Sequence, residues 1–134
     1  EIGSQATNFE HRSFGEELDL CQRYYQQSYL SGVAAATATT NGTLYISGSA
    51  GGLTTGYIAG SNNLRCQMRA TPTLVVYDPA GNAGKVRRDN FGTDNADNQT
   101  AAIENDGNQS FLVYSSGSHN AFVLLYHFTA SAEL

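Results

Sequence analysis

The run AFVLLYHF at residues 121–128 sets the architecture that we expect for this chain. Successive side chains of a β-strand point to opposite faces, and in this run both faces are apolar. One face carries Phe122, Leu124, Tyr126 and Phe128, and the other carries Ala121, Val123, Leu125 and His127. A sandwich strand with one face in water would alternate apolar and polar residues. We therefore expect a strand that is covered on both sides.

The runs LVVY (74–77) and FLVY (111–114) are also apolar on both faces. Such strands need a second cover, which is a helix, a loop of the same chain or another subunit. We infer a subunit interface, for which three-fold or another closed symmetry is the natural arrangement. The alternative is that the chain's own long loops shield these strands.

Other segments outside this run also alternate with period two, and turn signals such as Asn41-Gly42 and Asp106-Gly107 separate them. The predicted strands are 32–39, 43–47, 53–59, 64–69, 73–77, 84–89, 110–116 and 120–130. About eight strands at this spacing predict an all-β fold, a jelly-roll-like antiparallel β-sandwich.

One short N-terminal α-helix precedes these strands. Ser13 and Glu16 have the spacing of a capping box, which predicts a helix from about Phe14 to Arg23. Because so short a helix is unstable alone, we expect it to be docked on the rest of the fold. Residues 1–12 are interpreted as an arm or linker from an upstream module, and residues 13–134 as the sandwich domain. The missing initiator methionine suggests a fragment or a processed product.

Composition argues against some classes of function. The 134 residues carry a net charge of −5, so a nucleic-acid binder, which needs a basic face, is disfavoured. Charged residues make up 14% of the chain against roughly 25% in ordinary globular proteins, and neutral polar residues replace them. Lys85, Arg87 and Arg88 are followed by Asp89, which predicts a salt-bridged strand end. No run approaches the ~20 apolar residues of a membrane helix.

The two cysteines, Cys21 and Cys66, are expected to be free buried thiols, with a disulfide between them as the alternative. Cys66 alternates with Leu64 and Met68, which predicts an inward strand position. No catalytic residue, cofactor or zinc site is predicted, because the histidines and cysteines have no ligand spacing. His119 beside Ser118 is interpreted as a polar turn. Calcium binding by the acidic 89–106 loops is an alternative to solvated turns, with Asp89, Asp94, Asp97, Glu104 and Asp106 as ligands.

A glycan site is the remaining possibility. Sugar sites combine an exposed aromatic ring with a few fixed polar groups. The candidates lie in the loops at 48–63 and 89–98, and they are Tyr57, Asn62, Asn63, Asp94 and Asn95.

The block ATNFEHRSFGEELDLCQRYYQQSY at residues 6–29 resembles a segment near the C-terminus of bacteriophage tail-fibre, adhesin and head-fibre or decoration proteins. That segment runs Ala-Thr-Pro-Phe-Glu-x-Arg-x-x-Gly-x-Glu-Leu-x-Leu-Cys-Gln-Arg-Tyr-Tyr. The matching positions are Ala6, Thr7, Phe9, Glu10, Arg12, Gly15, Glu17, Leu18, Leu20, Cys21, Gln22, Arg23, Tyr24 and Tyr25, whereas Asn8 replaces the proline. Residues 68–86 and the terminal HFTASAEL are also similar to these proteins, so the resemblance spans nearly the whole chain.

The resemblance implies a non-enzymatic protein of the virion surface. We expect a C-terminal fibre or tail adhesin domain that forms a homo-oligomer, a trimer by preference, and engages host-surface polysaccharide or other virion proteins. The alternative is a capsid cement or decoration protein that stabilises the head. The short helix would then plug one end of the sandwich or trimer, with Tyr24 and Tyr25 anchoring its junction to the first strand.

Overall fold

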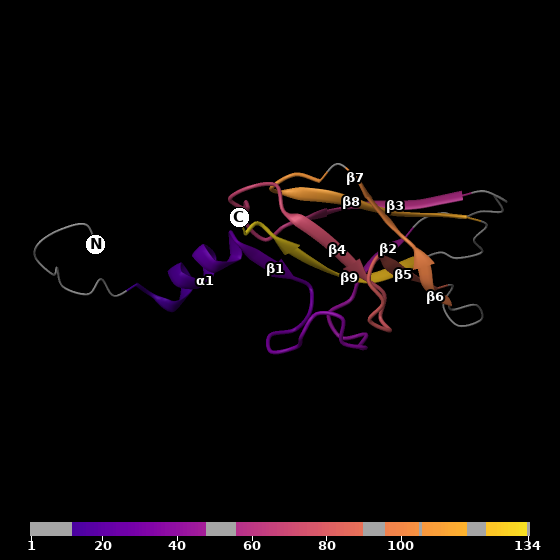
Figure 1. Cartoon of the computed structure of the whole chain (residues 1–134), viewed down its shortest axis with the longest axis horizontal. Helices are drawn as coiled ribbons and strands as arrows, with labels where there is room; N and C mark the ends of the chain where they lie inside the picture. Colours follow the sequence, from indigo (N-terminus) through magenta and orange to yellow (C-terminus); the bar gives the residue numbers. More distant parts are fainter. Residues whose placement is uncertain (1–11, 48–55, 90–95, 105, 118–122, 134) are drawn as a thin grey trace, which may run out of the picture.

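Two antiparallel sheets pack face to face, and one short helix precedes them (Figure 1). The computed structural model describes residues 12–47, 56–89, 96–104, 106–117 and 123–133. The elements are α1 (Phe14–Gln22), β1 (Tyr25–Gln27), β2 (Leu44–Ser47), β3 (Gly56–Asn63), β4 (Thr73–Tyr77), β5 (Lys85–Asp89), β6 (Ala96–Thr100), β7 (Ala102–Glu104), β8 (Ser110–Gly117) and β9 (Val123–Ser131). The predicted all-β sandwich with one short helix is confirmed.

Strand β9 is the centre of the larger sheet and pairs with four other strands. At one end, Ser131 lies between Tyr25 of β1 and Thr73 of β4. Towards the other end, Leu125 lies between Tyr45 of β2 and Arg87 of β5. Strand β6 extends the sheet beyond β5, and β3, β8 and β7 form the second sheet. The stretch that is apolar on both faces is therefore hydrogen-bonded on both edges as well.

The core lies between the two sheets and takes the even-numbered side chains of β9. Leu124 and Tyr126 are fully buried there with Val86 of β5 and Val113 of β8. Burial raises the pKa of the Tyr126 phenol to about 12, and the side chain of Asn62 lies beside it. Burying one such apolar side chain stabilises the fold by roughly 1.5–3 kcal/mol.

The opposite face of β9 is covered by the loop of residues 28–43, which we call the cover loop. The ring of Tyr29 stacks on that of His127, with 3.9 Å between centroids and 12° between planes. Both residues are buried, as is Thr129. Over this half of β9 the second cover is a loop of the same chain, so the inference that its two apolar faces require a subunit interface is wrong here.

Two glycines allow close backbone contacts of the cover loop, one with the turn between β4 and β5 and one within the loop itself. Gly81 has a φ of +92°, and a Cβ there would lie 2.3 Å from the carbonyl oxygen of Ala36. Gly42 has a φ of +84°, and a Cβ there would lie 2.6 Å from the carbonyl oxygen of Ser28. Both contacts are shorter than any side chain permits, so these positions admit only glycine without movement of the backbone.

Two predicted strands are absent. Residues 32–39 form turns, because Gly32 and Ala36 adopt positive φ values and interrupt the extended backbone. Residues 64–69 bend: Leu64 and Met68 are buried, but Cys66 between them is only half-buried. The predicted inward strand position of Cys66 is therefore wrong. The predicted strand 53–59 corresponds to β3, which runs on to Asn63, and neither β6 nor β7 is among the predicted strands.

Candidate functional site

Helix α1 begins as its sequence predicts. The Ser13 hydroxyl accepts a hydrogen bond from the Glu16 backbone N–H at 3.3 Å, and the Glu16 carboxylate accepts one from the Ser13 N–H at 2.8 Å. The Ser13 backbone N–H, and next the Ser13 hydroxyl, which donates to the same carboxylate at 3.0 Å, lower the pKa of the Glu16 carboxyl. The capping box thus satisfies amides that have no partner within the helix.

The helix is not docked, contrary to the prediction. None of its nine residues is buried, and it projects from one end of the sandwich (Figure 1). Phe14, Leu18 and Cys21 are spaced four and three positions apart and share one helix face, yet all three are exposed. Leu20 lies on the other side of the helix and is exposed as well. The helix therefore does not plug the sandwich of its own chain.

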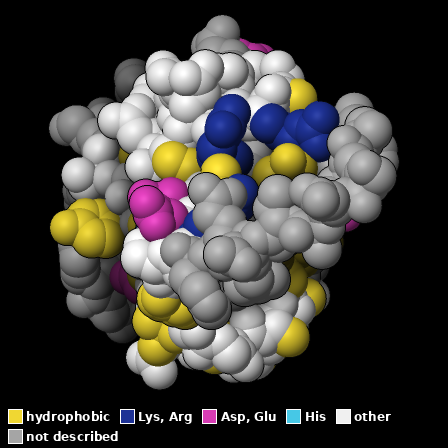
Figure 2. Space-filling view, turned by 90° about the vertical axis from the view of Figure 1, so that its left-hand side faces the viewer, with side chains coloured by type: hydrophobic (Ala, Val, Ile, Leu, Met, Phe, Trp, Pro, Cys, Tyr) yellow, Lys and Arg dark blue, Asp and Glu magenta, His cyan; other side chains and the backbone are white. Residues whose placement is uncertain are grey.

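Large apolar side chains are exposed on and around this helix. We call them the helix-end surface: Phe14 (83% exposed), Leu18 (43%), Leu20 (36%), Tyr24 (43%), Tyr25 (43%) and Leu30 (53%). Figure 2 looks at this end of the molecule and shows hydrophobic side chains at its surface, close to basic and acidic ones. Large exposed apolar side chains gathered at one end of a molecule are a common feature of interaction sites.

The helix is nevertheless held firmly at its base. Gln26 is buried, and its amide donates to the carbonyl oxygens of Gln22 at 3.1 Å and Cys66 at 3.0 Å, while its oxygen accepts from the Arg65 N–H at 2.8 Å. The Ala132 N–H donates to the Tyr24 carbonyl at 2.7 Å. These bonds join the end of α1 to β9 and to the 64–69 bend, so the helix projects from a fixed base.

Tyr24 contributes to the same junction. The guanidinium of Arg69 lies 5.0 Å from the centre of the Tyr24 ring, within the range of a cation–π interaction. The backbone N–H of Arg69 also donates to the carbonyl of Arg23 at 2.9 Å. These contacts agree with the predicted anchoring role of Tyr24.

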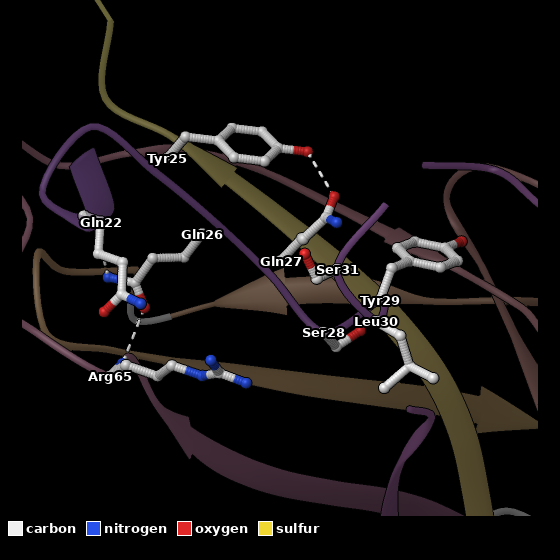
Figure 3. A pocket seen from close by; sticks show the side chains of 9 residues that line it. All are labelled: Gln22, Tyr25, Gln26, Gln27, Ser28, Tyr29, Leu30, Ser31 and Arg65. Carbon is white, nitrogen blue, oxygen red and sulfur yellow. Dashed lines mark hydrogen bonds between the residues drawn. The ribbon is translucent and has the colours of Figure 1, made fainter. Parts of the chain in front are cut away.

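A cleft of about 300 Å³ opens beside this junction (Figure 3). It is lined by Gln22, Tyr25, Gln26, Gln27, Ser28, Tyr29, Leu30, Ser31 and Arg65. Within the cleft, the Tyr25 hydroxyl donates to the Gln27 side chain at 2.9 Å. The lining consists of amides, hydroxyls, one guanidinium and the apolar side chain of Leu30, and it contains no carboxylate. Such a cleft can bind a polar segment, but it holds no acid–base pair for catalysis.

Ser28 and His127 form a polar pair below this cleft. The Nε2 of His127 lies 3.0 Å from the carbonyl oxygen of Thr39, which can only accept, so Nε2 carries the proton. Nδ1 then accepts from the Ser28 hydroxyl at 3.1 Å, whose oxygen accepts from the Phe128 N–H at 3.0 Å. Burial lowers the pKa of His127, and the Thr39 carbonyl opposes this effect. Because each polar atom is used, the pair fastens the cover loop to β9.

The predicted glycan residues do not converge. Tyr57 and the pair Asn62 and Asn63 lie towards opposite ends of β3, about 17 Å apart at the usual rise of a strand. Asn63 is exposed, whereas Nδ2 of Asn62 is buried, and the Asn62 side chain lies beside the Tyr126 hydroxyl, whose pKa it lowers. Asp94 and Asn95 lie outside the described residues.

The predicted salt-bridged strand end is present. Nε of Arg87 lies 3.9 Å from the Asp89 carboxylate and 4.0 Å from that of Asp97. Two of the proposed calcium ligands therefore neutralise an arginine, while Asp94 lies outside the described residues. In the described part of the chain, no cluster of three or more histidine, cysteine or acidic residues could hold a metal ion.

Both cysteines are free thiols, as predicted, but neither is buried. Cys21 is exposed and Cys66 is half-buried. Burial raises the pKa of Cys66, and nearby Asp19 acts in the same direction while Arg23 opposes it. His119 and Ser118 lie outside the described residues. Within the described ranges, no helix has the length and apolar character needed to cross a bilayer.

The helix-end surface is not expected from the sequence, because a short helix is expected to be covered by its own fold. The available signal is Leu20, which lies on the far side of the helix from Phe14 and Leu18, so one neighbouring surface cannot cover all three. Comparison of the chain with protein-family models, curated proteins and solved structures gave no match.

Proposed function

We propose that this chain is a non-catalytic domain of a bacteriophage fibre or tail adhesin on the virion surface, which assembles as a homotrimer through the helix-end surface and engages host glycan. One observation carries the proposal. The segment that resembles phage fibre proteins forms α1, none of whose residues is buried by its own chain. A nine-residue helix is marginal in water, so contacts from outside the chain would stabilise it.

Charge supports a second copy of this chain as the partner. The helix carries Glu16 and Glu17 in its first turn and no basic residue in its last turn. Its base carries exposed Arg23, Arg65 and Arg69. A cyclic trimer repeats one heterologous contact, so the acidic helix of one copy can face the basic base of the next. Complementary charge of this kind favours correct pairing over other contacts.

Sedimentation velocity on the Leu18→Glu variant tests the assembly. Leu18 is 43% exposed, so the fold of a single copy loses little, whereas a carboxylate buried at an apolar contact is strongly unfavourable. We expect the wild-type chain to sediment as a trimer and Leu18→Glu as a folded monomer. Thr40→Glu, which adds the same charge at an exposed position of the cover loop, is the matched control and stays trimeric. A wild-type chain that is monomeric at all micromolar concentrations contradicts the proposed assembly.

The adhesin role has a separate test. Wild-type protein is applied to an array of bacterial surface polysaccharides, and selective binding to some of them is expected. If none is bound while the trimer forms, the adhesin role fails. Electron microscopy of particles that carry or lack the protein then distinguishes a fibre from a capsid decoration.

A further inference from the structure

Among the described residues, the cover loop does not reach the β5 end of the larger sheet on its outer face. There the side chains of Tyr45, Ser47, Asp89, Val123 and Leu125 line a groove of about 390 Å³, which we call the β2–β9–β5 groove. The strand register fixes this arrangement. Tyr45 and Arg87 pair with Leu125 from either side, and Ser47 and Asp89 pair with Val123 from either side. Residues paired in register point to the same face of a sheet.

The residues paired with Leu125 and with Val123 give the groove an apolar floor and two different walls. Val123 and Leu125 of β9 form the floor. On one side stands Tyr45, which is 74% exposed and is the most exposed large apolar side chain outside the helix in the described part of the chain. On the other side Asp89 is ion-paired with Arg87, and their side chains are 20% and 25% exposed. The walls stand about 10 Å apart, which is twice the spacing of neighbouring strands.

This combination suits a sugar ring better than an apolar partner. One face of a pyranose carries C–H groups that pack on an aromatic ring, and its edge carries hydroxyls that both donate and accept hydrogen bonds. Those hydroxyls can donate to the Asp89 carboxylate while the ring lies against Tyr45. An apolar protein surface would remove water from the ion pair without replacing its hydrogen bonds, which is unfavourable.

We propose that the β2–β9–β5 groove binds a neutral pyranose unit of a polysaccharide, with Tyr45 as the stacking platform and Asp89 as the hydroxyl acceptor. This inference rests on the adhesin role proposed above and assigns it to a site. The site lies on a different face from the predicted glycan residues on β3. It is also separate from the helix-end surface, so assembly and sugar binding use different parts of the chain.

Amide NMR of the full chain tests the inference, with methyl glycosides of glucose, galactose and N-acetylglucosamine as probes. We expect at least one of them to shift the resonances of Tyr45, Ser47 and Leu125 in a saturable manner. Tyr45→Ala should weaken that binding about tenfold, because loss of a stacked ring has an effect of this size. Tyr114→Ala, which removes a half-buried tyrosine from the other sheet, is the matched control and leaves the affinity unchanged.

Three outcomes overturn the inference in distinguishable ways. If a glycoside or an arrayed polysaccharide binds elsewhere and Tyr45→Ala has no effect, the groove assignment fails and the adhesin role stands. If neither the glycosides nor the arrayed polysaccharides bind, the groove and the adhesin role both fail. If the groove resonances respond to protein concentration and not to sugar, a second copy occupies the groove and the sugar assignment fails.

Discussion

The outer face of β9 has two halves that share one strand but differ in what covers them. Around His127 and Thr129 the chain's own cover loop lies on the strand, and both residues are buried. Around Leu125 the described structure has no such loop, and Tyr45 is exposed beside a groove. Leu125 itself is only half-buried there, although Val123 at the end of this half is buried. Apolar residues on both faces therefore indicate that a second cover is needed for part of the strand, but they do not say which molecule supplies it.

The largest expected difference between the halves is in stability. Tyr29 is 4% exposed and stacks on His127, so Tyr29→Ala leaves a cavity and should lower the free energy of unfolding by about 3–5 kcal/mol. Tyr45→Ala changes an exposed side chain and should stay within about 0.5 kcal/mol. Urea unfolding at one fixed protein concentration measures both. If the two variants lose the same free energy of unfolding, the two halves of the outer face are equally covered and the comparison is wrong.

A smaller effect is expected at the polar fastening of the cover loop. Ser28→Ala removes the acceptor of the Phe128 N–H and the donor to Nδ1 of His127. We expect a loss of about 1–3 kcal/mol, since buried polar atoms are left without partners. Ser31→Ala, at an exposed position three residues later, is the control. If both variants unfold at the same urea concentration, the fastening contributes nothing measurable.

The smallest expected effect is a dependence on pH. Burial lowers the pKa of His127 below its ordinary value of 6.5, so the unfolded chain takes up the proton first as pH falls. Stability is then constant above about pH 6.5 and decreases below it, until the folded-state pKa is passed. His127→Gln should remove this decrease, and NMR titration of the imidazole reports its pKa directly. A measured pKa at or above 6.5 would contradict the neutral, buried pair.

Asp78 acts in a different pH range, so the two groups can be separated. Its carboxylate is fully buried; burial raises its pKa, but hydrogen bonds from Asn82, Asn98 and Ala80 outweigh that effect and lower it overall. A lowered carboxyl pKa gives stability that is present above the unfolded value of 3.8 and is lost as pH falls through the folded value. The decrease assigned to His127 therefore begins at a higher pH than the one assigned to Asp78.

Local patterns predicted the parts of the chain that depend on near neighbours in sequence. The capping box at Ser13 and Glu16, the period-two strands and the ion pair after Arg87 need only short-range information, and they were found. The alternation of Leu64, Cys66 and Met68 predicts a strand, but these residues form a bend. The backbone N–H groups of Leu64 and Met68 donate to the carbonyls of Gln109 and Asn108, and these long-range bonds hold the bend. No local pattern contains those bonds.

By itself, the sequence determined most of the strands that enclose the core, where the helix begins and that β9 is apolar on both faces. Only the tertiary structure decided what covers each face, because burial depends on residues brought together from distant positions. Tyr29 stacks on His127, although the two residues are far apart in the sequence. By contrast, no residue of α1 is buried. The unburied surfaces, and with them the candidate sites, follow from that long-range packing and not from the pattern of any one segment.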